Sequence, residues 1–502
     1  MMLSLELFIY ALLVLLTLIT GVFVWICVNI YQKHAQYSHL PGPKRSSFFA
    51  GNVDLIRVAA VERRVPFVQV MWEMQQEYGP VFVVYVFHQV LVFVCDPATV
   101  KTLLMNTEHT KPYTYDLMYD LYGIRFLGNG LVTEKDHSKW NARRKIFNPA
   151  FHRKQLIDFM GHFNTSSDKL VVKFKQDADT DKPVQLMDGL CRTTLDVIAK
   201  AGFGMKEELI LEDSPFIDAV ETSLKGMLHK FQNPFDWMNP RNWKYHAEIR
   251  KSLIFLRNFG RDTIAKSREE QYKGEAQTNN ILNNILKYFD FSKEEFDMET
   301  MVDEFLTFFV AGQETTSNML GFVLLELGRR PEIAKKVQEE IDSIVGDKEF
   351  VEYQDVMKME YSLLVLKEAL RLYPPAAGTS RECAHDLEVC GYHVPAGTNC
   401  QLTHYIMSRM EQFFKNPLEF DPDRFLRDED NPLYAYFPFS LGTRSCIGQQ
   451  FALIEARVIL AKLFQNFTFK LDQTQSFGIV DQLTLKPEGL CTNFIYTRKM
   501  AA

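Results

Sequence analysis

One cysteine near the end of the chain lies in surroundings that suit a metal ligand. Cys446 belongs to the segment 439–448, which has the form F-x-x-G-x-R-x-C-x-G. Its two glycines let the backbone bend tightly and approach a flat ring, and its arginine adds a positive charge near the sulfur. An apolar run follows and predicts a helix whose dipole and free amides favour a thiolate. A thiolate under amide donors is what an axial haem ligand needs, although a lone free cysteine is more often a buried structural thiol.

In this segment, and in those described below, the chain resembles the cytochrome P-450 family of haem-thiolate monooxygenases, over essentially its whole length. The resemblance implies the cytochrome P-450 fold, which is mainly α with small β-sheets (α+β). It implies haem b as the cofactor, with the iron bound by Cys446, and O2 as co-substrate. It also implies a lipophilic small-molecule substrate and electrons that come from NADPH through NADPH–cytochrome P-450 reductase.

A second segment, Ala311-Gly312-Gln313-Glu314-Thr315-Thr316, lies within a long helical pattern over 299–329 that stops before a proline. Gly312 in a helix interior costs ~1 kcal/mol relative to alanine, so small residues here suggest a close approach. The Thr315 hydroxyl can bond a carbonyl one turn back, and with Glu314 it offers an acid and a hydroxyl for proton relay. The resemblance implies that Glu314 and Thr315 deliver protons, whereas a plain helix-packing site is the alternative.

Three charged residues are expected to form a structural lock beneath the cysteine loop. Glu368 and Arg371 are three residues apart, so they share one face of a helix. Such pairs are often weak surface contacts. The resemblance implies that they bind Arg424 from a later P-x-R-F segment, which has Asp423 where the family more often has glutamate.

The haem propionates need cations, and guanidinium groups suit carboxylates in geometry. Trp140 and Arg144, spaced W-x-x-x-R, match family positions, as do Arg381 and Arg444. A packed tryptophan beside a surface arginine is the alternative for the first two. The resemblance thus implies this set of haem-contacting residues: Trp140, Arg144, Ala311, Gly312, Arg381, Phe439, Arg444, Cys446 and Gly448.

A basic face near the cysteine would attract an acidic reductase and speed its encounter. Lys135, Lys139, Arg143, Lys145 and Arg457 are the candidates for this face. A solvated helical face explains the same charges equally well.

The N-terminal region predicts a membrane anchor. Residues 7–30 carry no charge, and as a helix they would span ~36 Å, enough for a hydrocarbon core of ~30 Å. Basic residues follow this run and Glu6 precedes it, so the catalytic part is expected in the cytosol. We expect a transmembrane signal anchor over 1–32, a Pro-rich hinge over 33–50 and a single haem domain over 51–502, in the endoplasmic reticulum membrane. A cleaved signal peptide is the competing interpretation.

Further along, aromatic residues crowd the stretch 231–243, which fits a membrane interface or an ordinary core under a loop. Helical patterns dominate from about residue 140. Short runs of strand-favouring residues occur at 81–85, 90–94, 388–394 and near 468–471.

Four residues are candidates for the substrate pocket. Tyr115, Tyr119, Phe126 and Ala311 lie where the family places pocket-lining residues, although the aromatics could form a packing face. Segments 308–312, 372–376, 436–442 and 445–451 are most similar to the branch that hydroxylates the cholesterol side chain at carbon 24. Gln313 departs from that branch, which has histidine there.

Two other activities compete with sterol hydroxylation. Fatty-acid or eicosanoid hydroxylases belong to the same family, but many ω-hydroxylases carry a haem-linked glutamate at the position of Ala311. A hydroperoxide isomerase, or a haem-binding protein without monooxygenase activity, often lacks the acid–threonine pair that Glu314 and Thr315 form.

Composition excludes other classes of protein. The net charge is −7 with both signs mixed along the chain, which argues against a nucleic-acid partner. The eight cysteines show no C-x-x-C pair and no zinc spacing, so reduced thiols fit better than a disulfide framework.

Overall fold

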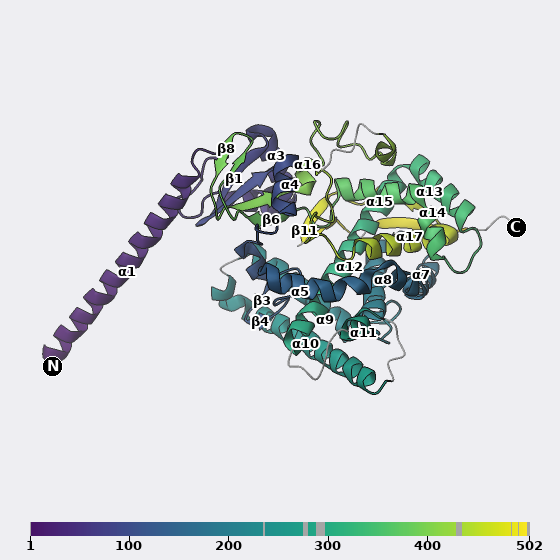
Figure 1. The fold of residues 1–502 in the computed structure, drawn as a ribbon, viewed down its shortest axis with the longest axis horizontal. Helices are drawn as coiled ribbons and strands as arrows, with labels where there is room; N and C mark the ends of the chain where they lie inside the picture. The colour runs from purple at the N-terminus through teal and green to yellow at the C-terminus, as the bar shows by residue number, and fades with distance from the viewer. Residues whose placement is uncertain are drawn as a thin grey trace.

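The structure is a computed structural model that describes residues 2–233, 236–274, 280–287, 297–427, 434–482, 484–489 and 491–498. A long helix, α1 (Met2–Gln36), extends away from the rest of the chain. A sheet-rich part lies at the base of this helix, and a larger helical part lies beyond it (Figure 1).

The sheet-rich part is built on a four-stranded sheet with the order β1-β2-β9-β6. β1 (Val81–Val86) and β2 (Gln89–Val94) form an antiparallel hairpin with residue 81 opposite residue 94. β9 (Asn399–Leu402) runs parallel to β2, and β6 (Thr379–Glu382) is antiparallel to β9. Valine and aromatic residues fill the first two strands and favour extended backbone. Their side chains are buried in a hydrophobic cluster separate from that of the helical part.

The helical part contains most of the long helices of the chain. The helices after α1 that have more than eight residues are α3 (Phe67–Tyr78), α4 (Pro97–Met105), α5 (His137–Phe147), α7 (Met160–Lys175), α8 (Leu186–Val197), α9 (Pro215–Gln232), α10 (Trp243–Tyr272), α12 (Met298–Arg329), α13 (Pro331–Ile344), α15 (Glu360–Leu372) and α17 (Gln449–Asn466). The shorter α-helices are α2 (Asp54–Arg57), α6 (Arg153–Asp158), α11 (Ile281–Leu286), α14 (Tyr353–Lys358) and α16 (His404–Met407).

The central element is α12, which packs against α8, α10, α15 and α17. Its first turn is capped by Asp297, whose carboxylate accepts hydrogen bonds from the Glu299 amide at 3.0 Å and the Thr300 hydroxyl at 2.5 Å. Most of its side chains are buried. The helix ends before Pro331, which begins α13.

Small sheets complete the domain. They consist of β3 (Asp120–Leu121) with β4 (Ile124–Arg125), β5 (Val184–Gln185) with β13 (Thr492–Thr497) and β10 (Phe467–Leu471), β7 (Leu387–Val389) with β8 (Tyr392–Val394), and β11 (Ile479–Gln482) with β12 (Thr484–Pro487).

The mainly helical fold with small sheets confirms the fold class expected from the sequence. The run 388–394, expected as one strand, is instead the hairpin of β7 and β8. Its turn has positive φ at Cys390 and Gly391, 49° and 82°. All eight cysteines are free thiols.

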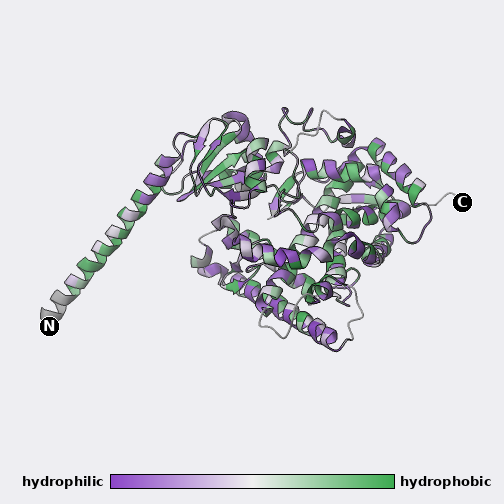
Figure 2. Cartoon of the chain, viewed as in Figure 1, coloured by the Kyte–Doolittle hydropathy of each residue, from purple (hydrophilic) through white to green (hydrophobic). Residues whose placement is uncertain are grey.

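The N-terminal helix α1 has one segment, Phe8–Gln36, that is long and apolar enough to cross a membrane. Figure 2 shows it mostly green and pale up to its base. At the base, Ile30 and His34 are buried, and a ring nitrogen of His34 is 3.1 Å from the Phe87 carbonyl oxygen. The helix therefore continues past the boundary expected at residue 32, and its last turns already belong to the packed body of the protein.

Candidate functional site

A cavity of about 310 Å³ lies between α12 and the segment that contains Cys446. Further walls come from the start of α17, from α5 and from residues 370–379, which lead into β6. Apolar side chains dominate the lining, including Leu131, Phe308 and Met319. Segments from widely separated parts of the sequence therefore meet at one cavity.

The Cys446 sulfur borders this cavity at the N-terminal end of α17. Its own amide donates to the Phe439 carbonyl at 2.8 Å. Burial raises the pKa of the thiol, while the amides of Gly448 and Gln449 and the charge of Arg144 oppose that rise. The amides and the charge favour a thiolate, whereas burial, the largest effect, favours the neutral thiol.

The cysteine loop is held in place by a close contact at Gly442. This residue has φ of 71°, and a Cβ on it would overlap the carbonyl oxygen of Leu104 at the end of α4. Only glycine meets both requirements, so the first glycine of the cysteine segment fixes the loop against α4.

Small residues of α12 form part of the cavity wall. Ala311, Gly312 and Thr315 all line it, and the Thr315 hydroxyl donates to the Ala311 carbonyl at 2.7 Å, as expected from the sequence. A Cβ on Gly312 would lie 3.2 Å from Ile198. The glycine therefore also allows close packing with Ile198, and the role of this segment in proton delivery stays a prediction.

Glu314 does not line this cavity but a second one, of about 330 Å³, between α8, α9, α12 and β12. Its Oε2 accepts a hydrogen bond from the Thr484 hydroxyl at 3.2 Å, and Thr484 in turn accepts one from the Asn318 amide at 2.9 Å. Burial raises the pKa of Glu314 to about 7, and Lys486 and Thr484 oppose the rise. The carboxyl group can therefore both bind and release a proton near neutral pH.

Four cations gather at one end of the first cavity: Lys111, Arg144, Arg381 and Arg444. All but Arg381 line it. The Arg444 guanidinium lies over the Trp140 ring at 4.6 Å and donates to the backbone carbonyls of residues 134 and 135. Burial and the charge of Arg381 lower the pKa of Arg444 to about 10, and burial lowers the pKa of Lys111, Arg144 and Arg381 as well.

The positive charge of these four side chains is not neutralised by the described residues around them. In the described part of the chain, none of the four is within ion-pair distance of a carboxylate. Like charges in a partly buried site are costly unless an anion joins them. Lys111 was not expected from the sequence, because a single lysine between polar residues and a proline carries no recognisable pattern.

The expected lock is present as a buried network. Two nitrogens of the Arg371 guanidinium, Nε and Nη2, each donate to the Glu368 carboxylate at 2.8 Å. Arg424 Nε donates to Glu368 Oε1 at 3.0 Å. Arg371 also donates to the carbonyls of Ser408 and Pro417 at 2.6 and 2.7 Å. The network ties α15 to the chain before the cysteine loop, and its role as a lock stays a prediction.

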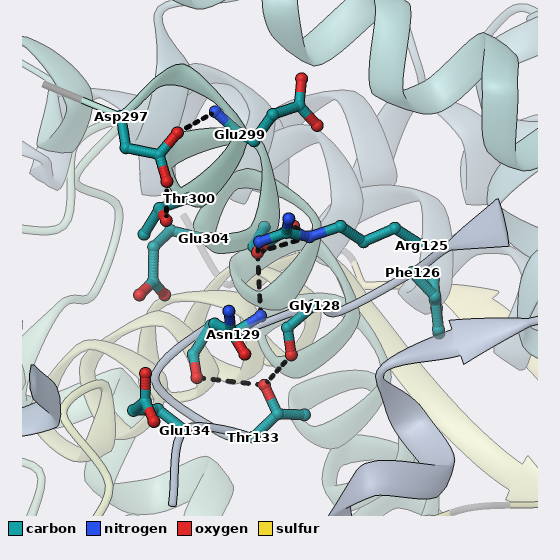
Figure 3. Close-up of polar contacts among 12 residues, drawn as sticks. Arg125, Phe126, Gly128, Asn129, Thr133, Glu134, Asp297, Glu299, Thr300 and Glu304 are labelled. Carbon is teal, nitrogen blue, oxygen red and sulfur yellow. Dashed lines mark hydrogen bonds and ion pairs between the residues drawn. The ribbon is translucent and has the colours of Figure 1, made fainter. Parts of the chain in front are cut away.

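A second charged network holds residues 125–134 against the first half of α12. Figure 3 shows Arg125 reaching from its strand toward that helix, where it pairs with the buried Asp303 at 2.5 Å. The Asn129 amide donates to Asp303 at 2.9 Å, and the Leu131 amide donates to Glu304 at 3.0 Å. Burial raises the pKa of Glu304 to about 7. This network supports the wall of the cavity at Leu131, and sequence reasoning missed it because its members are about 175 residues apart.

Two of the expected surface cations are not available at the surface. Arg143 pairs with Glu134 at 2.5 Å and Glu304 at 3.2 Å. Arg457 is 4% exposed and donates to the Leu453 and Val356 carbonyls at 2.9 and 2.7 Å. Arg143 and Arg457 are therefore not part of the expected basic face, because packing against α12 and α14 buries them.

Lys139 and Lys145 are exposed, and Lys135 pairs with Asp116 at 2.6 Å. These three remain as candidates for the basic face.

The three aromatic residues expected in the substrate pocket do not line the cavity. The Tyr115 hydroxyl is 3.1 Å from the Thr379 hydroxyl, one layer behind the wall. Tyr119 is partly exposed, with the Arg125 guanidinium 5.4 Å from its ring centre. Phe126 is 1% exposed within the main core. Of the four expected residues, Ala311 alone lines the cavity.

The residues present fit a haem group. A thiol under amide donors borders the cavity on one side, small residues of α12 border it on the other, and unneutralised cations stand at one edge. Cys446 would hold the iron, and Arg144, Arg381, Arg444 and Lys111 would face the propionates.

Comparison with known proteins agrees with this site. The family model for cytochrome P450 matches residues 41–492. The chain is 31% identical over 452 residues to cytochrome P450 4d2 of Drosophila melanogaster, covering 85% of this chain and 88% of the relative. It is 30% identical over 416 residues to cytochrome P450 3A6 of Oryctolagus cuniculus, covering 80% and 81%. It is 31% identical over 382 residues to cytochrome P450 4V2 of Homo sapiens, covering 72% of each. With a cavity whose residues fit a haem group and a family match over nearly its whole length, the chain belongs to the cytochrome P450 family of monooxygenases.

Proposed function

We propose that this protein is a membrane-anchored monooxygenase that inserts one oxygen atom of O2 into a C–H bond of a neutral lipophile. The favoured reaction is hydroxylation of a sterol side chain, that of cholesterol in particular. The observation that carries the proposal is the Cys446 thiol, which borders an apolar cavity that Thr315 also lines.

The cofactor of the proposal is haem b, which when bound supplies the activation of dioxygen. Cys446 binds the iron, and Gly448 and Gln449 stabilise its thiolate through their amides. Trp140, Arg144, Arg381 and Arg444 hold the propionates. Phe439, Ala311 and Gly312 shape the walls of the cavity at the sulfur and at α12.

Proton supply is assigned to Glu314 and Thr315. The Glu314 carboxyl has a pKa near neutrality and lies in a cavity with charged walls, which include Lys486 and Asp188. Thr315 presents its hydroxyl on the side of the Cys446 cavity. Glu314 takes up protons on one side of α12, and Thr315 holds the donor position on the other.

The preference for a neutral substrate follows from the charge distribution in the cavity wall. Its cations lie at one end, where they suit the propionates. The lining from α12 and from residues 370–379 is uncharged: Thr307, Phe308, Ala311, Gly312, Thr315, Thr316, Met319, Leu370, Pro375, Ala376, Gly378 and Thr379. A sterol needs no charged partner there, whereas a fatty acid leaves its carboxylate unpaired unless it reaches the cations.

Membrane attachment and electron supply complete the proposal. The helix α1 anchors the chain in the endoplasmic reticulum membrane as a single pass, with the catalytic part in the cytosol. Phe231, Met238 and Trp243 are exposed and suit the same membrane surface; Phe235 and the side chain of Trp237 lie outside the described residues. Lys139 and Lys145 form the exposed part of a face for NADPH–cytochrome P-450 reductase.

The proposal is tested with the full-length haem protein reconstituted with the reductase in lipid vesicles. Sterols, fatty acids and drug-like amines are titrated first, and the haem spectrum reports which of them bind. We expect cholesterol to shift the spectrum and to be hydroxylated on its side chain with consumption of NADPH and O2. Binding of fatty acids alone would favour a fatty-acid hydroxylase and contradict the sterol assignment. Turnover of a hydroperoxide without NADPH would contradict monooxygenation.

A further inference from the structure

Two histidines and an aspartate from three separate segments meet where α9 connects to α10. His229 lies in the last turn of α9, Asp236 in the short helix η5 (Asp236–Met238) and His246 in the first turn of α10. The Oδ2 atom of Asp236 is 2.8 Å from Nε2 of His229 and 2.5 Å from Nε2 of His246. The three ligand atoms lie within 4.8 Å of one another.

The three side chains are held in this arrangement by their neighbours. The Asn242 amide donates to Asp236 Oδ1, the oxygen that the histidines leave free. Burial opposes ionisation of Asp236, but hydrogen bonds from Asn242, His246 and His229 lower its pKa, so it is a carboxylate at neutral pH. The side chains of Asp236 and His246 are 6% and 9% exposed, whereas that of His229 is 28% exposed. The cluster is therefore preorganised on its buried side and open to solvent at His229.

A polar group beside the cluster lacks a partner in the described part of the chain. The ring of Tyr122 stacks on His246 at 4.1 Å with an angle of 18° between the ring planes. Its hydroxyl oxygen is buried and makes no hydrogen bond there. Burial and the charge of Asp236 raise the pKa of this hydroxyl to about 12. A buried hydroxyl of this kind usually bonds an ordered water or ion.

We propose that His229, Asp236 and His246 bind one Zn²⁺ ion, with water as the fourth ligand. Two imidazoles and a carboxylate with an open fourth position are an established zinc donor set. At Zn–N and Zn–O bond lengths of about 2.0–2.2 Å, tetrahedral ligand atoms are about 3.3 Å apart. The two N–O distances are shorter than that, so Asp236 needs to separate from each histidine by less than about 1 Å when Zn²⁺ replaces the shared protons.

Zinc at this position would connect the end of α9, the short helix η5 and the start of α10. Leu224 and Leu228 of α9, in the turns around His229, line the second cavity, into which Glu314 projects. Lys230 donates to the Asp120 carbonyl at 2.7 Å, and Arg250 donates to the Tyr122 carbonyl at 3.2 Å. Both bonds tie α9 and α10 to β3 and β4, which lie beside them in Figure 1. The ion would therefore stiffen the last turn of α9 and with it one wall of that cavity.

The test uses the full-length haem protein without a polyhistidine tag, freed of loosely bound metal by a chelator. Zn²⁺ is titrated by calorimetry, and bound zinc is counted after dialysis. We expect one Zn²⁺ per chain, with binding at least tenfold weaker in His246→Ala and in His229→Ala. His393→Ala is the matched control, because His393 is an exposed histidine 3.6 Å from Asp386 that belongs to no three-ligand cluster in the described part of the chain, and it should bind zinc like the wild type.

Two further readouts separate a metal site from a structural hydrogen-bond cluster. The spectrum of the reduced protein with carbon monoxide confirms that each variant is folded, and His229→Ala is the safer variant because His229 is the most exposed of the three. Zn²⁺ should slow amide hydrogen exchange in the last turn of α9 in the wild type and in the control only. Zinc binding that is substoichiometric, or equal in the cluster variants and the control, would overturn the proposal.

Discussion

Thr315 and Glu314 are neighbours in α12, yet their side chains border different cavities. Thr315 lines the cavity that Cys446 borders, and Glu314 lines the second cavity, between α8, α9, α12 and β12. Consecutive residues of an α-helix point about 100° apart, so one helix can separate a proton donor position from a proton reservoir. The pair therefore spans the helix and does not share one wall.

Replacing Thr315 should uncouple electron consumption from product formation. In Thr315→Ala the donor hydroxyl is gone, so product per NADPH should fall about tenfold or more while NADPH oxidation continues. Hydrogen peroxide released per NADPH measures the loss. Thr315→Ser keeps the hydroxyl and should stay near the wild-type value. Unchanged coupling in Thr315→Ala would remove the residue from the proton path.

The Glu314 carboxyl should make coupling depend on pH, and the Glu314→Gln variant should lack this dependence. Because burial raises its pKa to about 7, coupling in the wild type should titrate with a midpoint near that pH and become flat in Glu314→Gln. Glu221→Gln is the matched control, since Glu221 lines the same cavity but pairs with Lys225 at the surface. A titration that persists in Glu314→Gln would assign it to another group.

The same pKa predicts the direction of a stability effect. The folded state holds the Glu314 proton up to about pH 7, whereas the unfolded chain loses it near pH 4.3. The folded state therefore binds more protons between these values, and the stability contributed by this group decreases as pH rises through them. The melting temperature of the wild type should fall more than that of Glu314→Gln between pH 5 and 8.

Cys446→Ser should remove the red-shifted carbon-monoxide band of the reduced protein, because that band requires a thiolate on the iron. Absorption spectra of the reduced, carbon-monoxide-treated protein measure it. Cys390→Ser is the control, since Cys390 is an exposed thiol in the β7–β8 turn. A mutant at position 446 that kept the band would show that another residue binds the iron.

Breaking the buried lock should destabilise the domain. Arg424→Ala leaves Glu368 buried beside Arg371 alone, and loss of one partner of a buried pair costs about 3–5 kcal/mol. Thermal unfolding and haem retention measure the effect. Arg427→Ala, which removes an exposed arginine paired with Asp421, should cost less than about 1 kcal/mol. Equal losses of stability in the two variants would show that the buried network stabilises the domain no more than an exposed ion pair does.

Removing the apolar part of α1 should release the protein from membranes without loss of haem. Deletion of residues 2–29 keeps Ile30 and His34, which pack against the body of the protein. Sedimentation with vesicles and the haem spectrum are the two measurements. A deletion that extends through residue 36 should lower the melting temperature further, because it exposes that packed surface. Haem loss on the shorter deletion would contradict a separate anchor.

Local patterns were enough to predict the elements whose form depends on neighbours in the chain. The cysteine segment, the long helix α12, the strands β1 and β2 and the apolar run of α1 were all predicted, because helix, strand and turn preferences act over a few residues. The Glu368–Arg371 pair was predicted for the same reason, since three residues on a helix bring two side chains to one face.

The environment of individual side chains was decided only by the tertiary structure. Arg143 pairs with two acids, and one of them, Glu304, lies 161 residues away in the chain. Tyr119 and Phe126 do not line the cavity, because Tyr119 is partly exposed and Phe126 is buried in the main core. Lys111 and the His229–Asp236–His246 cluster carry no pattern in the sequence. The sequence therefore determined the family, the candidate cysteine ligand and the main elements, and the packing of distant segments determined which charges are buried, paired or open to a ligand.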